Sequence, residues 1–287
     1  MAGNVAIEPG VFLRWDPEGT PAPVLVDVSR SGREYPHDFR SPIPFTVLHD
    51  NVSMYVEELC GGAPGLGATM LYACFPNTYV DTNRSAVDID ESLIDGQWPG
   101  PVEKSDFTER GLGLIKRLSR YGEPMQERKL TVAEVQERLD RYHEPYHLEL
   151  ARIIADMKAR HGRAIQLSCH CMSAVGAPTH RDPGQERADF NIGDVHGTTC
   201  KPETIGFVQE TLEGLGHSVS VNFPYYGGYL VRRHSDPDNG VESVFIEINK
   251  RMFIDTSTFR RTDGFGRVKA TMDRLIAAVC ERARGAA

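Results

Sequence analysis

The chain has 287 residues, 40% of them hydrophobic and 25% charged, which are ordinary globular proportions and enough material for one large core. Its 32 Lys and Arg against 40 Asp and Glu give a net charge of −8, which argues against a nucleic-acid partner because phosphate backbones need a basic surface. No apolar run has the length of a membrane span, the first ten residues lack a signal-peptide pattern, and the six cysteines form no CxxC pair. Together these features predict a reduced cytoplasmic protein that does not act at a membrane.

Local patterns place the elements in chain order. Residues 1–22 are rich in Gly and Pro and predict an arm or first loop. Thr131 and Glu134 have the spacing of a capping box, which starts a long helix, and Pro145 should kink that helix or split it. The predicted strands cover residues 23–28, 68–75, 164–167, 218–223 and 243–248, and the predicted helices cover residues 51–59, 132–161, 202–215 and 268–280.

Strands that alternate with helices predict an α/β fold. We expect one domain over residues 23–287, with a mostly parallel mixed sheet and helices on both faces. Residues 96–127 have scattered Gly and Pro, and a long irregular insertion of this kind often forms one wall of a functional cleft.

The strongest candidate for chemistry follows the apolar strand at residues 164–167. It ends in Ser168-Cys169-His170-Cys171, and ligands of open α/β sheets collect beyond the carboxyl ends of strands. His170 between two thiols is therefore a candidate metal ligand or base. The alternative is a buried thiol pair beside a hydrogen-bonded histidine that serves packing alone.

A second candidate is the segment Asp81-Thr82-Asn83-Arg84. The Arg84 guanidinium is suited to bind a carboxylate through two hydrogen bonds, with Asn83 as a neutral donor. Equally, Arg84 is placed to pair with Asp88 or Asp90, which would make it structural.

Three further segments carry candidate site residues. Glu247 lies in an apolar strand, where burial would raise its pKa and suit it to general-base work, unless it forms an ion pair with Arg30, Arg84 or Arg233. Asp194 lies in a glycine-punctuated loop before a helix, where amides could bind an anion or simply form a turn. Gly227 and Gly228 allow the backbone to approach a ligand closely.

Taken together, these segments resemble the N-formylglutamate amidohydrolase family. The resemblance rests on PVLVDVSRSGREYPHDF, NTYVDTNRSAVDID, QLSCHCM, DFNIGDVHGTTC, NFPYYGGY and FIEINKRMFID, in that order, over residues 23–258. It implies a fold related to zinc carboxypeptidases and aspartoacylase, and hydrolysis of the amide C–N bond of a small anionic N-acyl amino acid by a metal-activated water. It further implies that Arg84 binds the substrate carboxylate and that Glu247 is the base.

The sequence departs from the family pattern at the implied zinc site. Arg30 and Ser53 occupy the positions of two expected ligands, and only His170 remains. Arg233 stands where family members usually have a histidine after the double glycine. A catalytic zinc needs about three protein ligands, and a guanidinium repels a cation. Either other groups complete a site or the chemistry has changed; the candidate groups are Cys169, Cys171, His37, His49 and Asp50.

Three hypotheses remain open at this stage. The chain is a C–N hydrolase with or without zinc, or a metal-independent enzyme with Cys171 or Cys169 as nucleophile and His170 or Glu247 as base, or a non-catalytic anion-binding relative. In all three, Arg30 and Arg84 predict a cationic pocket for a small-molecule ligand with two anionic groups. The oligomeric state is not predicted by the sequence.

Overall fold

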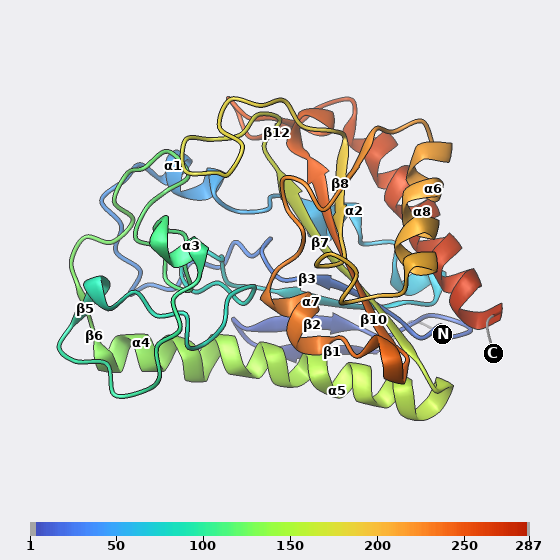
Figure 1. The fold of residues 1–287 in the computed structure, drawn as a ribbon, viewed down its shortest axis with the longest axis horizontal. Helices are drawn as coiled ribbons and strands as arrows, with labels where there is room; N and C mark the ends of the chain where they lie inside the picture. Colours follow the sequence, from blue (N-terminus) through green and yellow to red (C-terminus); the bar gives the residue numbers. More distant parts are fainter. Residues whose placement is uncertain (1–3, 286–287) are drawn as a thin grey trace.

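The structure is a computed structural model that describes residues 4–285. Its centre is an eight-stranded sheet with the strand order β1-β2-β4-β3-β7-β10-β8-β9 (Figure 1). In that order the strands are β1 (Val5–Glu8), β2 (Phe12–Trp15), β4 (Thr69–Ala73), β3 (Val24–Val28), β7 (Ala164–Met172), β10 (Val241–Asn249), β8 (Phe190–Gly193) and β9 (Val219–Val221). Two short pairs lie outside this sheet, β5 (Ile94–Asp95) with β6 (Leu130–Thr131) and β11 (Ile254–Asp255) with β12 (Arg260–Arg261).

The sheet is mixed and mostly parallel, as predicted. The central strands β4, β3, β7 and β10 run parallel to one another, and β8 runs parallel to β9. Antiparallel pairing joins β8 to β10 and adds β2 and β1 at the other edge. The predicted α/β class is confirmed.

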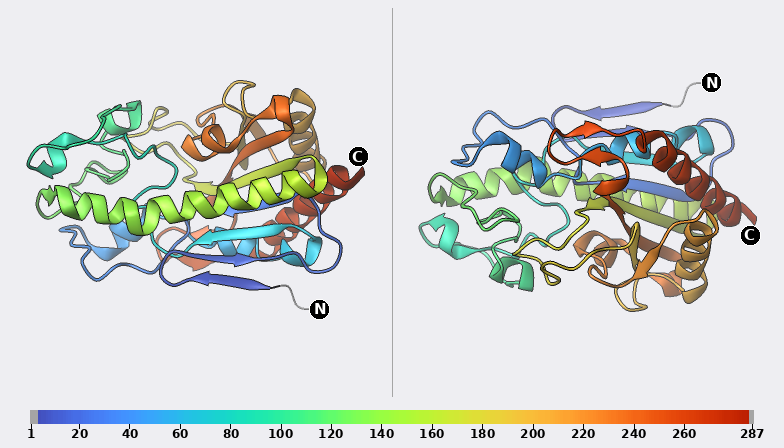
Figure 2. Two further views of the ribbon diagram at one scale, coloured as in Figure 1. Left: turned by 90° about the horizontal axis from the view of Figure 1, so that it is seen from below. Right: turned by 90° about the horizontal axis from the view of Figure 1, so that it is seen from above.

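Helices cover both faces of the sheet. They are α1 (Phe45–Asp50), α2 (Val56–Leu59), α3 (Asp106–Glu109), α4 (Val132–Arg138), α5 (Glu144–His161), α6 (Pro202–Gly214), α7 (Tyr229–His234) and α8 (Phe265–Gly285). Side chains of α2, α6 and α8 pack into one apolar cluster, and those of α4, α5 and α7 pack into a second. Figure 2 shows α5 crossing one face of the sheet and α8 lying over the other.

Two local predictions were wrong. Residues 5–15 form a hairpin of β1 and β2 that extends the sheet, because β2 pairs antiparallel with β4 and β1 pairs with β2. The helix expected over residues 51–59 is broken, since Tyr55 is left-handed at φ 65° and α2 begins only after it. Before α2, the Ser53 amide donates to the Arg30 carbonyl at 2.9 Å. This bond ties residues 51–54 to the turn at residues 29–32, so they do not form a helix.

The long helix after Thr131 follows the prediction more closely. Thr131 and Glu134 form the predicted capping box. A π-helical turn at Leu139–His143 divides the helix, and Pro145 lies directly after it, in the first turn of α5. Left-handed Gly162 ends α5, so that β7 begins at Ala164.

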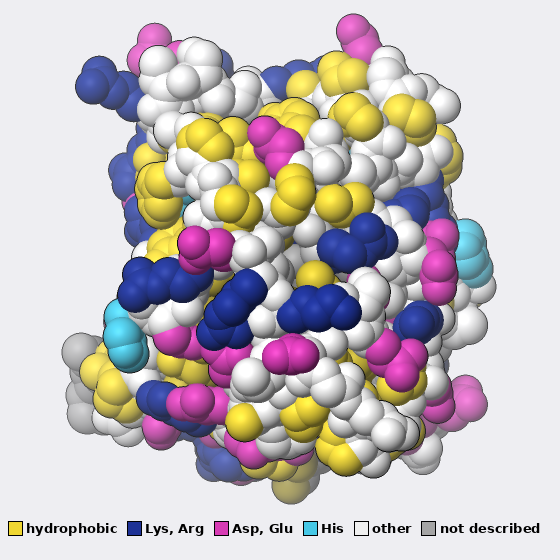
Figure 3. All heavy atoms as spheres, turned by 90° about the vertical axis from the view of Figure 1, so that its left-hand side faces the viewer, with side chains coloured by type: hydrophobic (Ala, Val, Ile, Leu, Met, Phe, Trp, Pro, Cys, Tyr) yellow, Lys and Arg dark blue, Asp and Glu magenta, His cyan; other side chains and the backbone are white. Residues whose placement is uncertain are grey.

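The loops of residues 96–127 and the helices α1 and α3 lie together on the side of the molecule away from the C-terminus (Figure 1). Viewed from that side, Lys and Arg side chains alternate with acidic ones across the middle of the surface (Figure 3). No helix within residues 4–285 is long and apolar enough to cross a membrane.

Candidate active site

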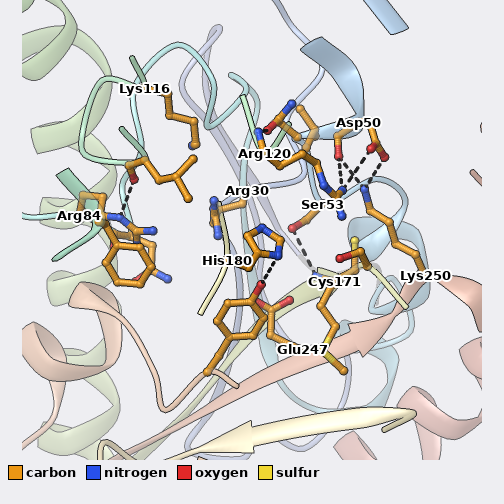
Figure 4. Close-up of a pocket in the computed structure, with 18 of the residues that line it drawn as sticks. Arg30, Asp50, Ser53, Arg84, Lys116, Arg120, Cys171, His180, Glu247 and Lys250 are labelled. Carbon is orange, nitrogen blue, oxygen red and sulfur yellow. Dashed lines mark hydrogen bonds and ion pairs between the residues drawn. The ribbon is translucent and has the colours of Figure 1, made fainter. Parts of the chain in front are cut away.

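A pocket lies beyond the carboxyl ends of β3, β7 and β10, where α/β sheets bind ligands. Residues from segments far apart in the sequence line it, and many of them are drawn in Figure 4. The segment of residues 96–127 supplies one wall, as predicted, through Phe107, Arg110, Leu112, Lys116 and Arg120.

Glu247 reaches the pocket because side chains alternate along β10. Val244, Ile246 and Ile248 pack into the apolar cluster of α8, so Phe245 and Glu247 face the opposite side and line the pocket. The Glu247 side chain is 3% exposed, its Oε2 has no hydrogen-bond partner, and no Lys or Arg of residues 4–285 lies within ion-pair distance. Burial raises the pKa of Glu247 to about 7 against the opposing charges of Arg30 and Arg187. The alternative, an ion pair of Glu247 with Arg30, Arg84 or Arg233, is therefore not formed among the described residues.

His170 is the register partner of Glu247 on β7 but has different surroundings. It is fully buried, does not line the pocket, and packs on Phe245 with ring centroids 4.8 Å apart. Its Nε2 lies 3.1 Å from Ser168 Oγ, which donates to Asp27 Oδ2 at 2.8 Å, so Nε2 carries the proton. Burial, followed by the charge of Arg30, holds the pKa of His170 well below its usual value.

Arg84 is a buried cation that forms no ion pair with any residue of the range 4–285. Its side chain lines the pocket, donates to the carbonyls of Leu112 and Asn83 at 3.2 and 2.8 Å, and lies 3.5 Å from the Phe107 ring centroid. The alternative of an ion pair with Asp88 or Asp90 is wrong, because Asp88 accepts from Ser105 and Thr108 while Asp90 pairs with Arg117. Burial lowers the pKa of Arg84 to about 10, so it stays charged at neutral pH.

A buried carboxylate, Asp81, holds two cations of the same wall. Its Oδ2 lies 3.2 Å from Arg30 Nη2 and 2.9 Å from Lys116 Nζ, and Oδ1 accepts from the Asn83 amide at 3.1 Å. These partners, led by Arg30, overcome the effect of burial and lower the pKa of Asp81. Burial lowers the pKa of Lys116 to about 7 even beside Asp81.

Asp50 plays the corresponding part on the opposite wall (Figure 4). Its Oδ1 lies 3.1 Å from Lys250 Nζ and its Oδ2 lies 3.2 Å from Arg120 Nη1. Arg120 Nε is buried and has no hydrogen-bond partner among residues 4–285. Each of the carboxylates Asp50 and Asp81 is thus ion-paired with two cations. Because Arg84 forms no ion pair within the described residues, cations outnumber carboxylates around the pocket.

The remaining predicted residues divide between the pocket and its surroundings. Cys171, Asn83 and Gly227 line the pocket, and a Cβ atom on Gly228 would meet Asn83 Oδ1 at 2.1 Å. Burial raises the pKa of the Cys171 thiol to about 11, which leaves little thiolate.

Three predicted residues lie away from this pocket. Asp194 Oδ1 accepts from the Gly197 amide at 2.9 Å and from Asn222 at 2.8 Å, so it closes a turn. Arg233 is exposed and donates to Tyr229 Oη at 2.7 Å. Cys169 points to the opposite face of the sheet and packs in the core beside Cys60. None of these three residues lines the pocket.

The side chains at the implied zinc positions do not fit a dication. Arg30 is ion-paired with Asp81, Ser53 Oγ accepts the Cys171 amide at 3.3 Å, and His170 lies beneath the pocket. Among the suggested replacements His37 is exposed, His49 Nδ1 lies 3.0 Å from Tyr35 Oη, and Asp50 is neutralised by two cations. Within residues 4–285, no three His, Cys, Asp or Glu side chains gather in a metal-binding arrangement.

Several pocket residues were not predicted: Lys116, Arg120, Lys250, His180 and Tyr225. Lys250 had a usable signal, since it directly follows a strand that already held a candidate base. The others lie in irregular segments whose path to the pocket has no local sequence pattern.

Comparisons with known proteins agree with this architecture. A family model described as N-formylglutamate amidohydrolase matches residues 22–254. The N-formylglutamate deformylase of Pseudomonas aeruginosa is 27% identical over 206 residues, which are 70% of each chain. The crystal structure of an N-formylglutamate amidohydrolase from Ralstonia eutropha JMP134 has a TM-score of 0.90 at 32% identity, covering 97% of this chain and all of that one. A gene product of Agrobacterium tumefaciens, with a TM-score of 0.67 at 16% identity over 93% of this chain and 92% of that one, shares the fold.

Proposed function

This chain belongs to the N-formylglutamate amidohydrolase family, a family of amide hydrolases, and we propose that it hydrolyses the amide C–N bond of a small acidic N-acyl amino acid without a bound zinc. The observation that carries the proposal is the pair of buried, unpaired charges in one pocket, the Arg84 guanidinium and the Glu247 carboxylate. Leaving such groups without partners is costly, and active sites are where proteins retain them.

Arg84 and Asn83 are the proposed anchor for the substrate carboxylate. A guanidinium binds a carboxylate through two parallel hydrogen bonds, and the contacts of Arg84 with Leu112, Asn83 and Phe107 fix its orientation. Arg120 and Lys250 on the opposite wall would receive a second anionic group, since their shared carboxylate neutralises only one of the two charges. This arrangement supports a substrate with two anionic groups.

Glu247 is the proposed general base. Its carboxylate takes a proton from water as the water oxygen bonds to the amide carbon, and the carbonyl oxygen becomes an oxyanion. The same carboxyl group then gives the proton to the amide nitrogen as the C–N bond breaks, which yields a carboxylic acid and an amine. A pKa of about 7 suits both transfers near neutral pH.

The alternative with a cysteine nucleophile has less support. Cys171 has a raised pKa and no base within hydrogen-bond distance among the described residues, and Cys169 lies on the other face of the sheet. A non-catalytic role in anion binding would leave the unpaired Glu247 carboxylate without a purpose.

The test is amine release by the full chain from N-formyl, N-acetyl and N-succinyl derivatives of glutamate, aspartate, leucine and glutamine. We expect turnover with kcat/KM at least about tenfold higher for an acidic amino acid than for its neutral counterpart, the scale of one charge-assisted hydrogen bond. Absence of amine release from every compound would refute the hydrolase and support the anion-binding alternative.

A further inference from the structure

His180 lies in the loop between β7 and β8 and lines the same pocket. Figure 4 places its imidazole between Arg30 and Glu247, in the middle of the site. Neither the sequence patterns nor the resemblance to the family marked this residue, and the proposed base mechanism leaves it unused.

The hydrogen bonds of His180 determine which ring nitrogen carries the proton. Nδ1 lies 2.9 Å from Arg187 Nη2, 3.1 Å from the Ala177 amide nitrogen and 3.5 Å from Tyr225 Oη, a hydroxyl that can donate to it. A guanidinium and a backbone N–H can only donate, so Nδ1 must present its lone pair to both. The proton of the neutral ring is therefore on Nε2, which makes no hydrogen bond with any residue of the range 4–285 and is directed away from the wall that holds Nδ1.

The groups around His180 are fixed in place. Arg187 forms a two-pronged ion pair with Asp182, with distances of 2.7 and 2.6 Å, and both side chains are 1% exposed. The neighbouring Thr179 donates through its hydroxyl to the Arg120 carbonyl at 2.9 Å and accepts from Arg110 at 2.8 Å. The Nδ1 edge of the imidazole and the chain before it are thus fixed, as a preorganised donor requires.

Burial and the nearby arginines keep the ring neutral. Arg187, Arg120 and Arg110 oppose protonation, and Asp182 favours it. Burial, reinforced by Arg187, lowers the pKa of His180 to about 3. Over the physiological range the ring therefore offers one N–H donor to the pocket and does not release it.

We propose that His180 is a catalytic residue whose Nε2–H donates a hydrogen bond to the carbonyl oxygen of the scissile amide and stabilises the oxyanion formed when water adds. This inference rests on the proposed function and deepens it, because a site without a fitting metal set needs another group to stabilise that charge. His180 keeps its proton throughout, and Glu247 alone carries the proton from water to the leaving nitrogen.

Substitution of His180 separates a donor from a structural residue. His180→Phe removes the donor and should lower kcat about 10²- to 10³-fold with KM changed less than about threefold, as when one oxyanion donor is removed. His180→Gln places an amide N–H near the former Nε2 position and should recover kcat to within about tenfold of wild type. The matched control is His217→Gln, since His217 bonds Thr271 at 2.9 Å far from this pocket and should leave kcat unchanged.

The tautomer itself is measured by ¹⁵N NMR of imidazole-labelled full chain, with the His180 signals assigned by their absence in His180→Gln. We expect the Nε2–H tautomer, without imidazolium, from pH 5 to pH 8. An Nδ1–H or charged ring would overturn the assignment whatever the turnover, and so would a properly folded His180→Phe variant with wild-type kcat. If wild type releases no amine from any N-acyl amino acid, the proposed hydrolase activity is refuted, and so is the catalytic role of His180. An Nε2–H signal in the same protein would then show that the tautomer is assigned correctly and that the proposed reaction is wrong.

Discussion

The ends of β7 and β10 offer an instructive comparison, because His170 and Glu247 are register partners on the same face of the sheet. His170 is connected downward, through Ser168 to Asp27, and is covered by Phe245 and the chain around it. Glu247 has no partner for one carboxylate oxygen and lines the pocket. Two polar residues at equivalent strand ends therefore differ in their hydrogen bonds: His170 Nε2 has a buried partner, and Glu247 Oε2 has none among residues 4–285. The unsatisfied one is the better candidate for chemistry.

The largest effect should come from Glu247→Gln. Removing the base should lower kcat about 10³-fold, within the range that general bases contribute. The matched control is Glu242→Gln on the same strand, whose carboxylate accepts from the Lys201 amide at 2.9 Å and lies outside the pocket. Steady-state kinetics with the best substrate of the panel measure both. A Glu247→Gln variant as active as the Glu242 control would remove Glu247 from the mechanism.

Glu247→Gln should lower activity but raise the stability of the folded protein at high pH. Burial raises the pKa of folded Glu247 from about 4.5 to about 7, so the folded protein keeps a proton that the unfolded chain releases between these pH values. This group therefore costs wild-type stability as the pH rises from 4.5 through 7, up to about 3 kcal/mol. Urea unfolding should show Glu247→Gln gaining stability over wild type at pH 8 but not at pH 4.

Arg84→Lys should have the next largest effect. A lysine keeps the charge but loses the fork, which should weaken the transition-state contact by about 1.5–3 kcal/mol, or roughly 10- to 150-fold in kcat/KM. Arg117→Lys is the control, since Arg117 pairs with Asp90 away from the pocket. Unchanged KM and kcat in Arg84→Lys would show that Arg84 only supports the loop of Leu112.

For His170 the comparison predicts a loss of stability with little loss of activity, the reverse of the prediction for Glu247. His170→Phe removes the donor to Ser168 inside a buried network and should destabilise the fold by about 1–3 kcal/mol, while kcat stays within about tenfold. Urea unfolding and kinetics on one preparation give both quantities. A stable variant without activity would place His170 in the reaction after all.

The sequence predicted this part of the molecule unevenly, for physical reasons. Apolar periodicity located the central strands and the helices α5, α6 and α8, because alternation and helical spacing are local properties. It also singled out Glu247 and Arg84, which line the pocket, since a lone charge within an apolar strand or beside an Asn in a polar segment is conspicuous. What it could not supply was the difference between His170 and Glu247, which depends on Asp27, Ser168 and Phe245 from three strands. His180 escaped for the same reason, since its role depends on Arg187 and on the path of an irregular loop.

Cys171→Ser tests a smaller difference between the two strand ends. The Cys171 thiol lines the pocket but has a pKa raised to about 11, so we expect kcat to change less than about threefold. Cys200→Ser is the control, a buried cysteine of the core. A loss of more than about 100-fold at Cys171 alone, with an acyl-enzyme detected by mass spectrometry, would establish the nucleophile alternative.

The smallest expected effect is that of a chelator, which should leave wild-type activity unchanged. The reason lies in the charges around the implied zinc position, where Arg30 is fixed to Asp81 at 3.2 Å and Ser53 offers a neutral oxygen. A guanidinium beside a dication is strongly repulsive at the low effective dielectric of a closed pocket. The double variant Arg30→His with Ser53→Asp should bind zinc more tightly than wild type in calorimetric titration. The third ligand would be His170 Nδ1, which has no hydrogen-bond partner among the described residues. The contrary result would be wild-type protein that binds stoichiometric zinc tightly through His170 and loses turnover with a chelator. It would make His170 part of the catalytic centre and contradict its assignment as a structural residue.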